Sequence, residues 1–326
     1  MGKDHSTDAS IDPQGHGTGA EGDGVNRRGF LRCMQWAGTG LLWTMAGGVP
    51  QSRLLGQSGK RAAAPAGEFS FVQISDSHIG FARDANPDVK GTLQAAIDKI
   101  NGEGSPEFLL HTGDITQNSK PDEFDNAAEI LKSTKTKEAF YVPGEHDVMG
   151  GGKQYMDRYG KNTKGRGWYS FDHKGVHFIG LVNVVDFKEG FGTLGDDQLE
   201  WLEDDVKAKT PSTPIVVFAH IPLWTVYPQW GWGTADSEKA LGYLKKFGSL
   251  TILNGHIHQT MQKVEGNVTF HTACSTAFPQ PKPGAAAGPG PMKVPADQLR
   301  SALGITDVKF VRGQKSLAIV DQSLAS

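Results

Sequence analysis

The sequence predicts an α/β or α+β layered sandwich, and three observations lead to this prediction. Short apolar runs alternate with amphipathic helical segments in the first part of the chain after residue 66, which is typical of βαβ units. Further along, the strand-like runs follow one another more closely, which indicates a layered sheet structure. The chain also contains 42 glycines and 17 prolines among 326 residues, a composition that favours many loops and argues against a helical bundle or coiled coil.

The expected elements follow from apolar periodicity and turn signals. In residues 89–100, Val89, Leu93, Ala96, Ile97 and Ile100 share one helical face, and Pro121 is placed to open the next helix. Two further helices are expected over residues 196–208 and 237–247. Strands are expected over residues 69–75, 107–112, 139–142, 168–171, 176–181, 215–219, 250–253, 268–273, 308–311 and 317–320. Residues 279–295 are rich in Pro, Gly and Ala and are predicted to form a surface loop or lid.

Residues 1–66 lack this periodicity and are predicted to be a leader, with the folded domain spanning residues 67–326. The polar, glycine-rich residues 1–24 are expected to be disordered. The pair Arg27-Arg28, followed by Phe30-Leu31 and a modestly apolar stretch, resembles a twin-arginine export signal. That resemblance implies the twin-arginine export machinery as a partner, a periplasmic or secreted location and no stable membrane span in the mature form. The alternative is a basic pair ahead of an ordinary core helix.

The composition excludes several classes of function. The formal net charge is −3, so nothing favours a nucleic-acid coat protein or a polybasic membrane binder. Cys33 and Cys274 are the two cysteines, which excludes a disulfide-stapled scaffold and a zinc site made of four cysteines. With 37% hydrophobic residues the chain can bury a sizeable core.

Five of the expected strands end in residues that commonly bind metals. Each cluster directly follows an apolar run, so each is expected just past the C-terminal edge of a sheet, where open α/β sheets bind their ligands. Carboxylates and imidazoles suit hard or borderline divalent ions, and neighbouring glycines let the backbone approach the ions closely. The clusters are Asp76-Ser77-His78, Gly113-Asp114, Gly144-Glu145-His146-Asp147, His220, and Gly255-His256-Ile257-His258.

This ordered set resembles the calcineurin-like metallophosphoesterase superfamily, over roughly residues 69–274. The resemblance implies a four-layer sandwich of two mixed β-sheets flanked by helices. It also implies a first metal held by Asp76, His78 and His258, a second held by His220 and His256, and Asp114 bridging the two. In that scheme a metal-bridging hydroxide attacks phosphorus, His146 assists the leaving group, and Asp147 orients His146 through a hydrogen bond.

One position departs from the superfamily pattern, which has Asn where this chain has Glu145. We expect Glu145 to be a ligand of the second metal that adds one negative charge and alters metal choice. Iron or manganese is then favoured, with zinc as an alternative. The opposing interpretation is that Glu145 swings away and water takes its place.

The substrate class depends on the segment that follows His220. Residues 222–232 contain three tryptophans and a tyrosine, which either stack on a substrate group or close onto the protein's own core. We expect an exported metal-dependent phosphoesterase, with a phosphodiester favoured slightly over a phosphomonoester. The alternatives are a phosphomonoesterase of acid-phosphatase type, and a metal-binding scaffold that has lost turnover because of Glu145.

Overall fold

The computed structural model describes residues 40–46, 49–55, 67–104, 106–184, 191–314 and 316–325. The chain divides into two units, Met1–Gly59 and Lys60–Ser326. In the first unit, β1 (Gly40–Ala46) and β2 (Val49–Leu55) pair as an antiparallel hairpin. The arginine pair and the segment expected to be disordered lie outside the described residues. Within the described ranges, no helix combines the length and apolarity needed to cross a membrane.

The second unit contains a five-stranded sheet with the order β13-β12-β3-β4-β5. Strands β3, β4 and β5 are parallel, and β12 joins β3 in antiparallel fashion. The parallel strands therefore end at the same edge of the sheet. The bounds are β3 (Phe69–Ile74), β4 (Phe108–His111), β5 (Glu138–Tyr141), β12 (Gly304–Phe310) and β13 (Ala318–Ser323).

A six-stranded sheet follows the order β10-β11-β9-β8-β7-β6. Its central strands β7, β8, β9 and β11 are parallel, and the two edge strands are antiparallel to their neighbours. The bounds are β6 (Tyr169–His173), β7 (Val176–Gly180), β8 (Ile215–Phe218), β9 (Leu250–Asn254), β10 (Met261–Glu265) and β11 (Val268–Thr272).

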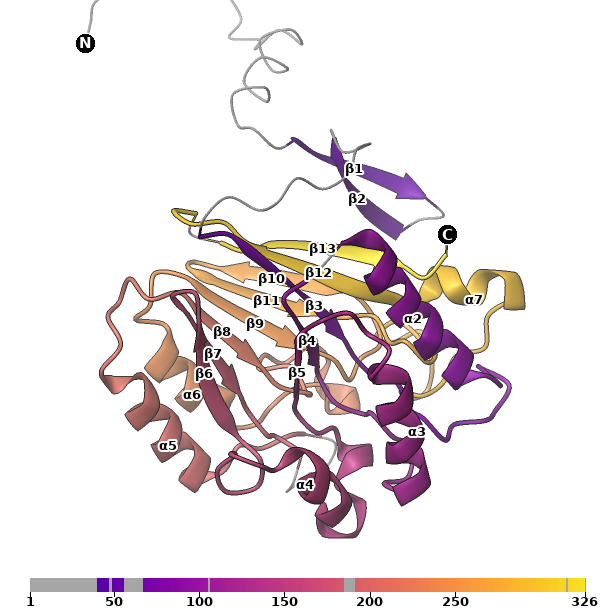
Figure 1. Cartoon of the computed structure of the whole chain (residues 1–326), viewed down its shortest axis with the longest axis horizontal. Helices are drawn as coiled ribbons and strands as arrows, with labels where there is room; N and C mark the ends of the chain where they lie inside the picture. Colours follow the sequence, from indigo (N-terminus) through magenta and orange to yellow (C-terminus); the bar gives the residue numbers. More distant parts are fainter. Residues whose placement is uncertain are drawn as a thin grey trace, which may run out of the picture. The chain divides into compact units, whose positions relative to one another are not determined.

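The two sheets face each other and helices cover their outer faces, which confirms the four-layer arrangement (Figure 1). Both faces of a central strand are buried: in β8, Val216 and Phe218 pack between the sheets, whereas Ile215 and Val217 pack against helices. The helices α2 (Val89–Glu103), α3 (Pro121–Leu131), α4 (Lys153–Tyr159) and α7 (Ala296–Ala302) pack on the five-stranded sheet, and α5 (Asp196–Lys207) and α6 (Ser237–Leu244) on the six-stranded sheet.

Every helix and strand expected after residue 66 is present, with bounds that differ by a few residues. Three elements were not expected: β10, α4 and α7. Strand β10 was not predicted because four of its five residues are exposed and its sequence shows no apolar alternation. It forms through pairing with β11 across the turn at Gly266, whose φ is 61°. The charged side chains of this edge strand are typical of edges that avoid further pairing.

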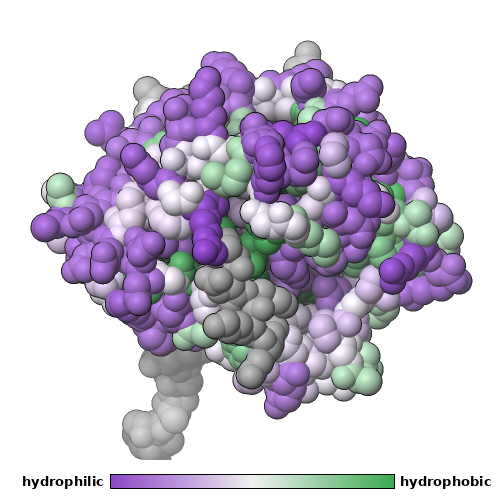
Figure 2. All heavy atoms as spheres, turned by 90° about the horizontal axis from the view of Figure 1, so that it is seen from below, coloured by the Kyte–Doolittle hydropathy of each residue, from purple (hydrophilic) through white to green (hydrophobic). Residues whose placement is uncertain are grey.

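A buried glutamine joins the two sheets beside their C-terminal edge. Gln73 of β3 donates to Thr112 Oγ1 (2.9 Å) and to the carbonyl of Asn254 in β9 (3.0 Å). Unpaired buried amides are costly, so these bonds fix how the two edges face each other. The face of the described residues seen in Figure 2 is mostly hydrophilic, with small hydrophobic areas between polar side chains.

Candidate metal centre

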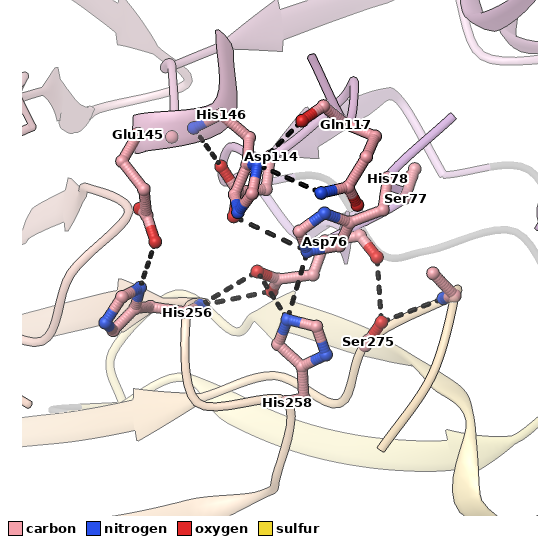
Figure 3. A network of polar contacts seen from close by, with 12 residues as sticks. Asp76, Ser77, His78, Asp114, Gln117, Glu145, His146, His256, His258 and Ser275 are labelled. Carbon is pink, nitrogen blue, oxygen red and sulfur yellow. Dashed lines mark hydrogen bonds and ion pairs between the residues drawn. The ribbon is translucent and has the colours of Figure 1, made fainter. Parts of the chain in front are cut away.

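The predicted ligands all lie just past strand ends and converge between the two sheets. Asp76 and His78 follow β3, Asp114 follows β4, and Glu145 opens a 3-10 helix (Glu145–Asp147) after β5. From the six-stranded sheet come the histidines that follow β8 and β9. The structure thereby brings together Asp76, His78, Asp114, Glu145, His220, His256 and His258 (Figure 3 labels all of these except His220).

The first group of ligands is formed by Asp76, His78 and His258, all fully or almost fully buried. His258 Nε2 lies 3.3 Å from Asp76 Oδ1 and 3.2 Å from His78 Nε2. His78 Nε2 also lies 3.5 Å from Asp114 Oδ2. Two imidazole nitrogens and two carboxylates therefore point at one small volume, which is the donor set expected for a divalent cation.

The second group is formed by Glu145, His220 and His256. Glu145 Oε2 lies 3.0 Å from His220 Nε2, and its Oε1 lies 3.1 Å from His256 Nδ1. The two histidine nitrogens are 3.3 Å apart. Asp114 Oδ2 is 3.4 Å from His220 Nε2, so this oxygen contacts both groups and lies between them. The donor chemistry fits two cations that share Asp114.

Backbone carbonyls orient two of the histidines by accepting hydrogen bonds from the ring nitrogen that faces away from the centre. His220 Nδ1 donates to the carbonyl of Thr112 (2.7 Å), and His258 Nδ1 donates to that of Phe278 (2.6 Å). Each bond fixes the tautomer and leaves Nε2 facing the centre, as is usual for metal-binding histidines. The ring of Phe278 also packs against the His258 ring with centroids 4.8 Å apart. No chemical signal in the sequence pointed to Phe278, which is one apolar residue among many.

The backbone at the ligands is strained. Five of the eight described non-glycine residues with positive φ belong to the two groups, with φ values between 40° and 70°. Such conformations are uncommon outside glycine and concentrate at functional sites. The five are Asp76, His78, Asp114, His256 and His258.

Three glycines make room for the ligands. A Cβ atom at Gly144 would lie 2.0 Å from Asp114 Oδ1, and one at Gly113 would lie 2.6 Å from His220 Nδ1. At Gly255 a Cβ would lie 1.9 Å from Ser75 Oγ. These positions require glycine because the segments that follow the strands approach each other closely there, between the sheets at Gly113 and Gly255 and within the five-stranded sheet at Gly144.

The electrostatics of the centre follow from burial and from the mutual contacts of its groups. Burial lowers the pKa of His78 to about 3, so its imidazole is neutral and suited to ligation. Burial would also lower the pKa of His220, but Asp114 and Glu145 outweigh it and raise that pKa well above its usual value. Burial would raise the pKa of Glu145, yet the neighbouring histidines hold it well below its usual range.

His146 lies beside the first group but is held by a residue that the sequence did not single out. Its Nδ1 is 2.7 Å from the carbonyl oxygen of Gln117 and 3.3 Å from Gln117 Nε2. Its backbone N–H donates to Asp114 Oδ1 (3.0 Å), and its ring meets the His78 ring at 75° with centroids 4.9 Å apart. Gln117 lies three residues after Asp114 in the same loop, and this nearness along the chain is the signal that could have pointed to it.

The predicted hydrogen bond from Asp147 to His146 is wrong. The Asp147 carboxylate is fully buried and accepts from the backbone N–H groups of Gly144, Ile115 and Thr116, and from the Thr116 hydroxyl. Its side chain points into the loop after β4 because three N–H donors converge there, whereas His146 turns toward Gln117. Asp147 fixes the loop that carries Asp114 and does not contact the imidazole.

The aromatic segment closes largely onto the protein itself. Trp232 is 1% exposed, and Trp224 packs against Phe270 of β11 with ring centroids 5.2 Å apart. Trp230 meets the Trp232 ring edge-on, with centroids 4.9 Å apart. Of the two interpretations left open by the sequence, packing on the core accounts for Trp224 and Trp232.

Comparisons with known proteins agree with this geometry. The family model described as calcineurin-like phosphoesterase matches residues 69–260. A 3′,5′-cyclic-nucleotide phosphodiesterase of Nostoc sp. is 25% identical over 216 residues, covering 64% of this chain and 79% of that protein. A "Probable glycerophosphodiester phosphodiesterase GpdQ" of Arcobacter nitrofigilis is 29% identical over 225 residues, covering 63% of this chain and 77% of that protein.

Among solved structures, a dimetal phosphatase from Danio rerio superposes with a TM-score of 0.54 at 14% identity. The match covers 78% of this chain and 99% of that one. At this identity the likeness concerns the fold alone, and it agrees with the two-sheet sandwich described above.

Proposed function

Because the chain belongs to the calcineurin-like phosphoesterase family, it is a metal-dependent phosphoesterase with a two-ion centre, and we propose that its substrates are phosphodiesters. The observation that carries the proposal is the convergence of two ligand groups on the shared carboxylate of Asp114, with the imidazole of His146 beside them. The names of both relatives, a cyclic-nucleotide and a glycerophosphodiester phosphodiesterase, support the choice of a diester.

The charge of the centre favours the same choice. Asp76, Asp114 and Glu145 together supply three negative charges against the four positive charges of two divalent ions. The hydroxide that acts as nucleophile supplies a fourth negative charge, so the centre is neutral before the substrate binds. A phosphodiester then adds one negative charge to this buried place and a phosphomonoester dianion adds two, so the diester is the less unfavourable of the two.

Asp76, His78 and His258 would hold one ion, Glu145, His220 and His256 the other, and Asp114 both. When bound, the ions supply Lewis-acid stabilisation of charge on the phosphoryl oxygens and lower the pKa of a water molecule that acts as nucleophile.

His146 supplies the proton for the leaving group. Burial would lower the pKa of His146, but Asp114 and Glu145 outweigh it, and the carbonyl of Gln117 also raises that pKa. Because Nδ1 donates to this carbonyl, the proton on Nε2 is the one available to the departing alkoxide oxygen. Gln117 is therefore a positioning residue that fixes the tautomer and the ring.

The test compares diester and monoester hydrolysis by the same preparation. We expect kcat/KM for bis(4-nitrophenyl) phosphate to exceed that for 4-nitrophenyl phosphate by about 10-fold or more with Mn²⁺, Fe²⁺ or Zn²⁺. A 3′,5′-cyclic nucleotide and a glycerophosphodiester are the two natural diesters to include. Faster hydrolysis of the monoester would identify a phosphatase of acid-phosphatase type. No hydrolysis of any of them, with ions bound, would identify a metal-binding scaffold.

We further propose that residues 1–66 export the folded domain through the twin-arginine machinery to the periplasm or the medium. The support is the pair Arg27-Arg28 with Phe30-Leu31 and the apolar stretch after it. Fusing residues 1–66 to a reporter that is exported only when folded tests this proposal. We expect export of the fusion and its loss when both arginines are replaced by lysine. Export of the lysine variant, or none of the original, would refute it.

A further inference from the structure

The two ligand groups have matching donor sets, and Glu145 is the residue that makes them match. The first group offers one carboxylate of its own, two imidazole nitrogens and a share of Asp114. The second group offers the same: its own carboxylate is Glu145, its imidazoles are His220 and His256, and Asp114 is shared.

We propose that Glu145 is a ligand of the second ion and that, because of it, the protein binds two ions of the same element with comparable affinity. This inference rests on the proposed two-ion function. With a neutral amide at position 145, the second group would have no carboxylate of its own. It would then hold its ion more weakly than the first group, because the charge of the ligands sets much of the affinity for a hard cation.

The position of the Glu145 side chain supports ligation over the alternative that it swings away. Its two carboxylate oxygens each face one imidazole nitrogen, at 3.0 Å from His220 and 3.1 Å from His256. The atom Oε2 is buried, and its polar contact in the described structure is the one with His220 Nε2. A buried oxygen of this kind, aimed between two imidazoles, is suited to a cation.

The local backbone places the carboxylate there. Glu145 is the first residue of the 3-10 helix after β5, and it follows Gly144, whose missing side chain lets this turn lie against Asp114. The side chain of Glu145 is 22% exposed, whereas that of Asp76 in the first group is fully buried. The side of Glu145 is therefore the more exposed side of the centre.

The test measures ion binding directly, so it does not depend on turnover. The full chain is stripped with a chelator and titrated with Mn²⁺ by calorimetry, and bound ions are counted by elemental analysis after gel filtration. For the wild type we expect two Mn²⁺ ions with dissociation constants within about tenfold of each other. For Glu145→Gln we expect one ion bound as before and the other weakened by about 100-fold or more.

Controls separate ligation from folding and from charge in general. Glu129→Gln removes an exposed carboxylate from α3 and should leave both ions bound as in the wild type. Electron paramagnetic resonance gives a second readout: a spin-coupled Mn²⁺ pair in the wild type and an isolated Mn²⁺ spectrum in Glu145→Gln. Glu145→Asp keeps the charge on a shorter side chain and should retain more of the second ion than Glu145→Gln.

The outcomes distinguish this inference from the proposed function. Two ions bound by Glu145→Gln with wild-type affinities would overturn the inference and leave the two-ion function standing. Two wild-type affinities that differ by more than about 100-fold would overturn it as well. If the wild type bound no Mn²⁺, Fe²⁺ or Zn²⁺, both the inference and the proposed function would fail.

Discussion

Replacing Asp147 by asparagine separates a structural role of this carboxylate from a catalytic one. Its Oδ2 accepts from the N–H groups of Ile115 and Gly144, both at 3.0 Å. Its Oδ1 accepts from the Thr116 N–H (2.8 Å) and hydroxyl (2.9 Å). In Asp147→Asn the amide oxygen can keep the bonds from Ile115 and Gly144. The NH₂ group then takes the place of Oδ1, where it can donate to the Thr116 hydroxyl but leaves the Thr116 N–H without an acceptor.

The expected loss of stability follows from the bond that the Thr116 N–H loses. A hydrogen bond to a charged acceptor contributes about 1.5–3 kcal/mol, so the loss is about 1.5–3 kcal/mol. Domains of 150–250 residues shift by about 2–4 °C per kcal/mol, and the chain from residue 67 is close to that size. We therefore expect the thermal midpoint of Asp147→Asn to fall by about 3–12 °C.

Calorimetry or circular dichroism on chelator-treated protein measures this shift without a contribution from bound ions. Asp157→Asn is the matched control, because Asp157 is exposed and forms a surface ion pair with Lys153 in α4. A midpoint of Asp147→Asn within about 2 °C of the wild type would refute the reasoning. A loss of kcat in such a stable variant would show that Asp147 acts on His146 after all.

Three further predictions address the centre and its surroundings. His146→Ala should lower kcat by about 10²–10⁴-fold while calorimetric titration shows both ions still bound, since His146 donates a proton and holds no ion in this scheme. Gly144→Ala should weaken ion binding in the same titration, because the new Cβ would lie 2.0 Å from Asp114 Oδ1. The control is Gly102→Ala, whose new Cβ meets no atom within 4 Å and should stabilise α2 by up to about 1 kcal/mol. Burial lowers the pKa of His111 to about 4, so its contribution to stability is complete above pH 6.5 and is lost as the pH falls toward 4. Urea unfolding at pH 7 and pH 5 should therefore show a smaller loss of stability for His111→Gln than for the wild type.

The sequence predicted most of the core because its strands are buried on both faces. Residues 215–219 are continuously apolar and residues 250–253 are apolar except for Thr251, and the structure places both runs in the middle of a sheet. The ligands could be predicted for a related reason: each directly follows such a run, and the C-terminal ends of parallel strands meet at one edge.

What the sequence did not reveal depends on contacts between segments far apart in the chain. The direction of Asp147 is set by N–H groups about 30 residues earlier, in the loop after β4, and no local pattern encodes it. The contact between Gln117 and His146 depends on the packing of the loop after β4 against the turn after β5, which no local pattern in the sequence predicts. Strand β10 is mostly exposed, so pairing with β11 rather than burial makes it a strand.

The strained backbone at the ligands is held by hydrogen bonds that extend the five-stranded sheet. Left-handed conformations at five non-glycine residues cost about 1 kcal/mol or more each, which together approaches the net stability of an ordinary domain. Backbone hydrogen bonds beside the sheet offset this conformational free energy. The N–H of Asp76 donates to the carbonyl of Gly113, and the N–H of His78 donates to the carbonyl of Asp114, both at 2.9 Å. Because those bonds continue the pairing of β3 with β4, the side chains that would bind the ions are held in position before any ion arrives. Ion binding therefore requires little ordering of the protein, and the affinity of each ion depends on the charges that surround it.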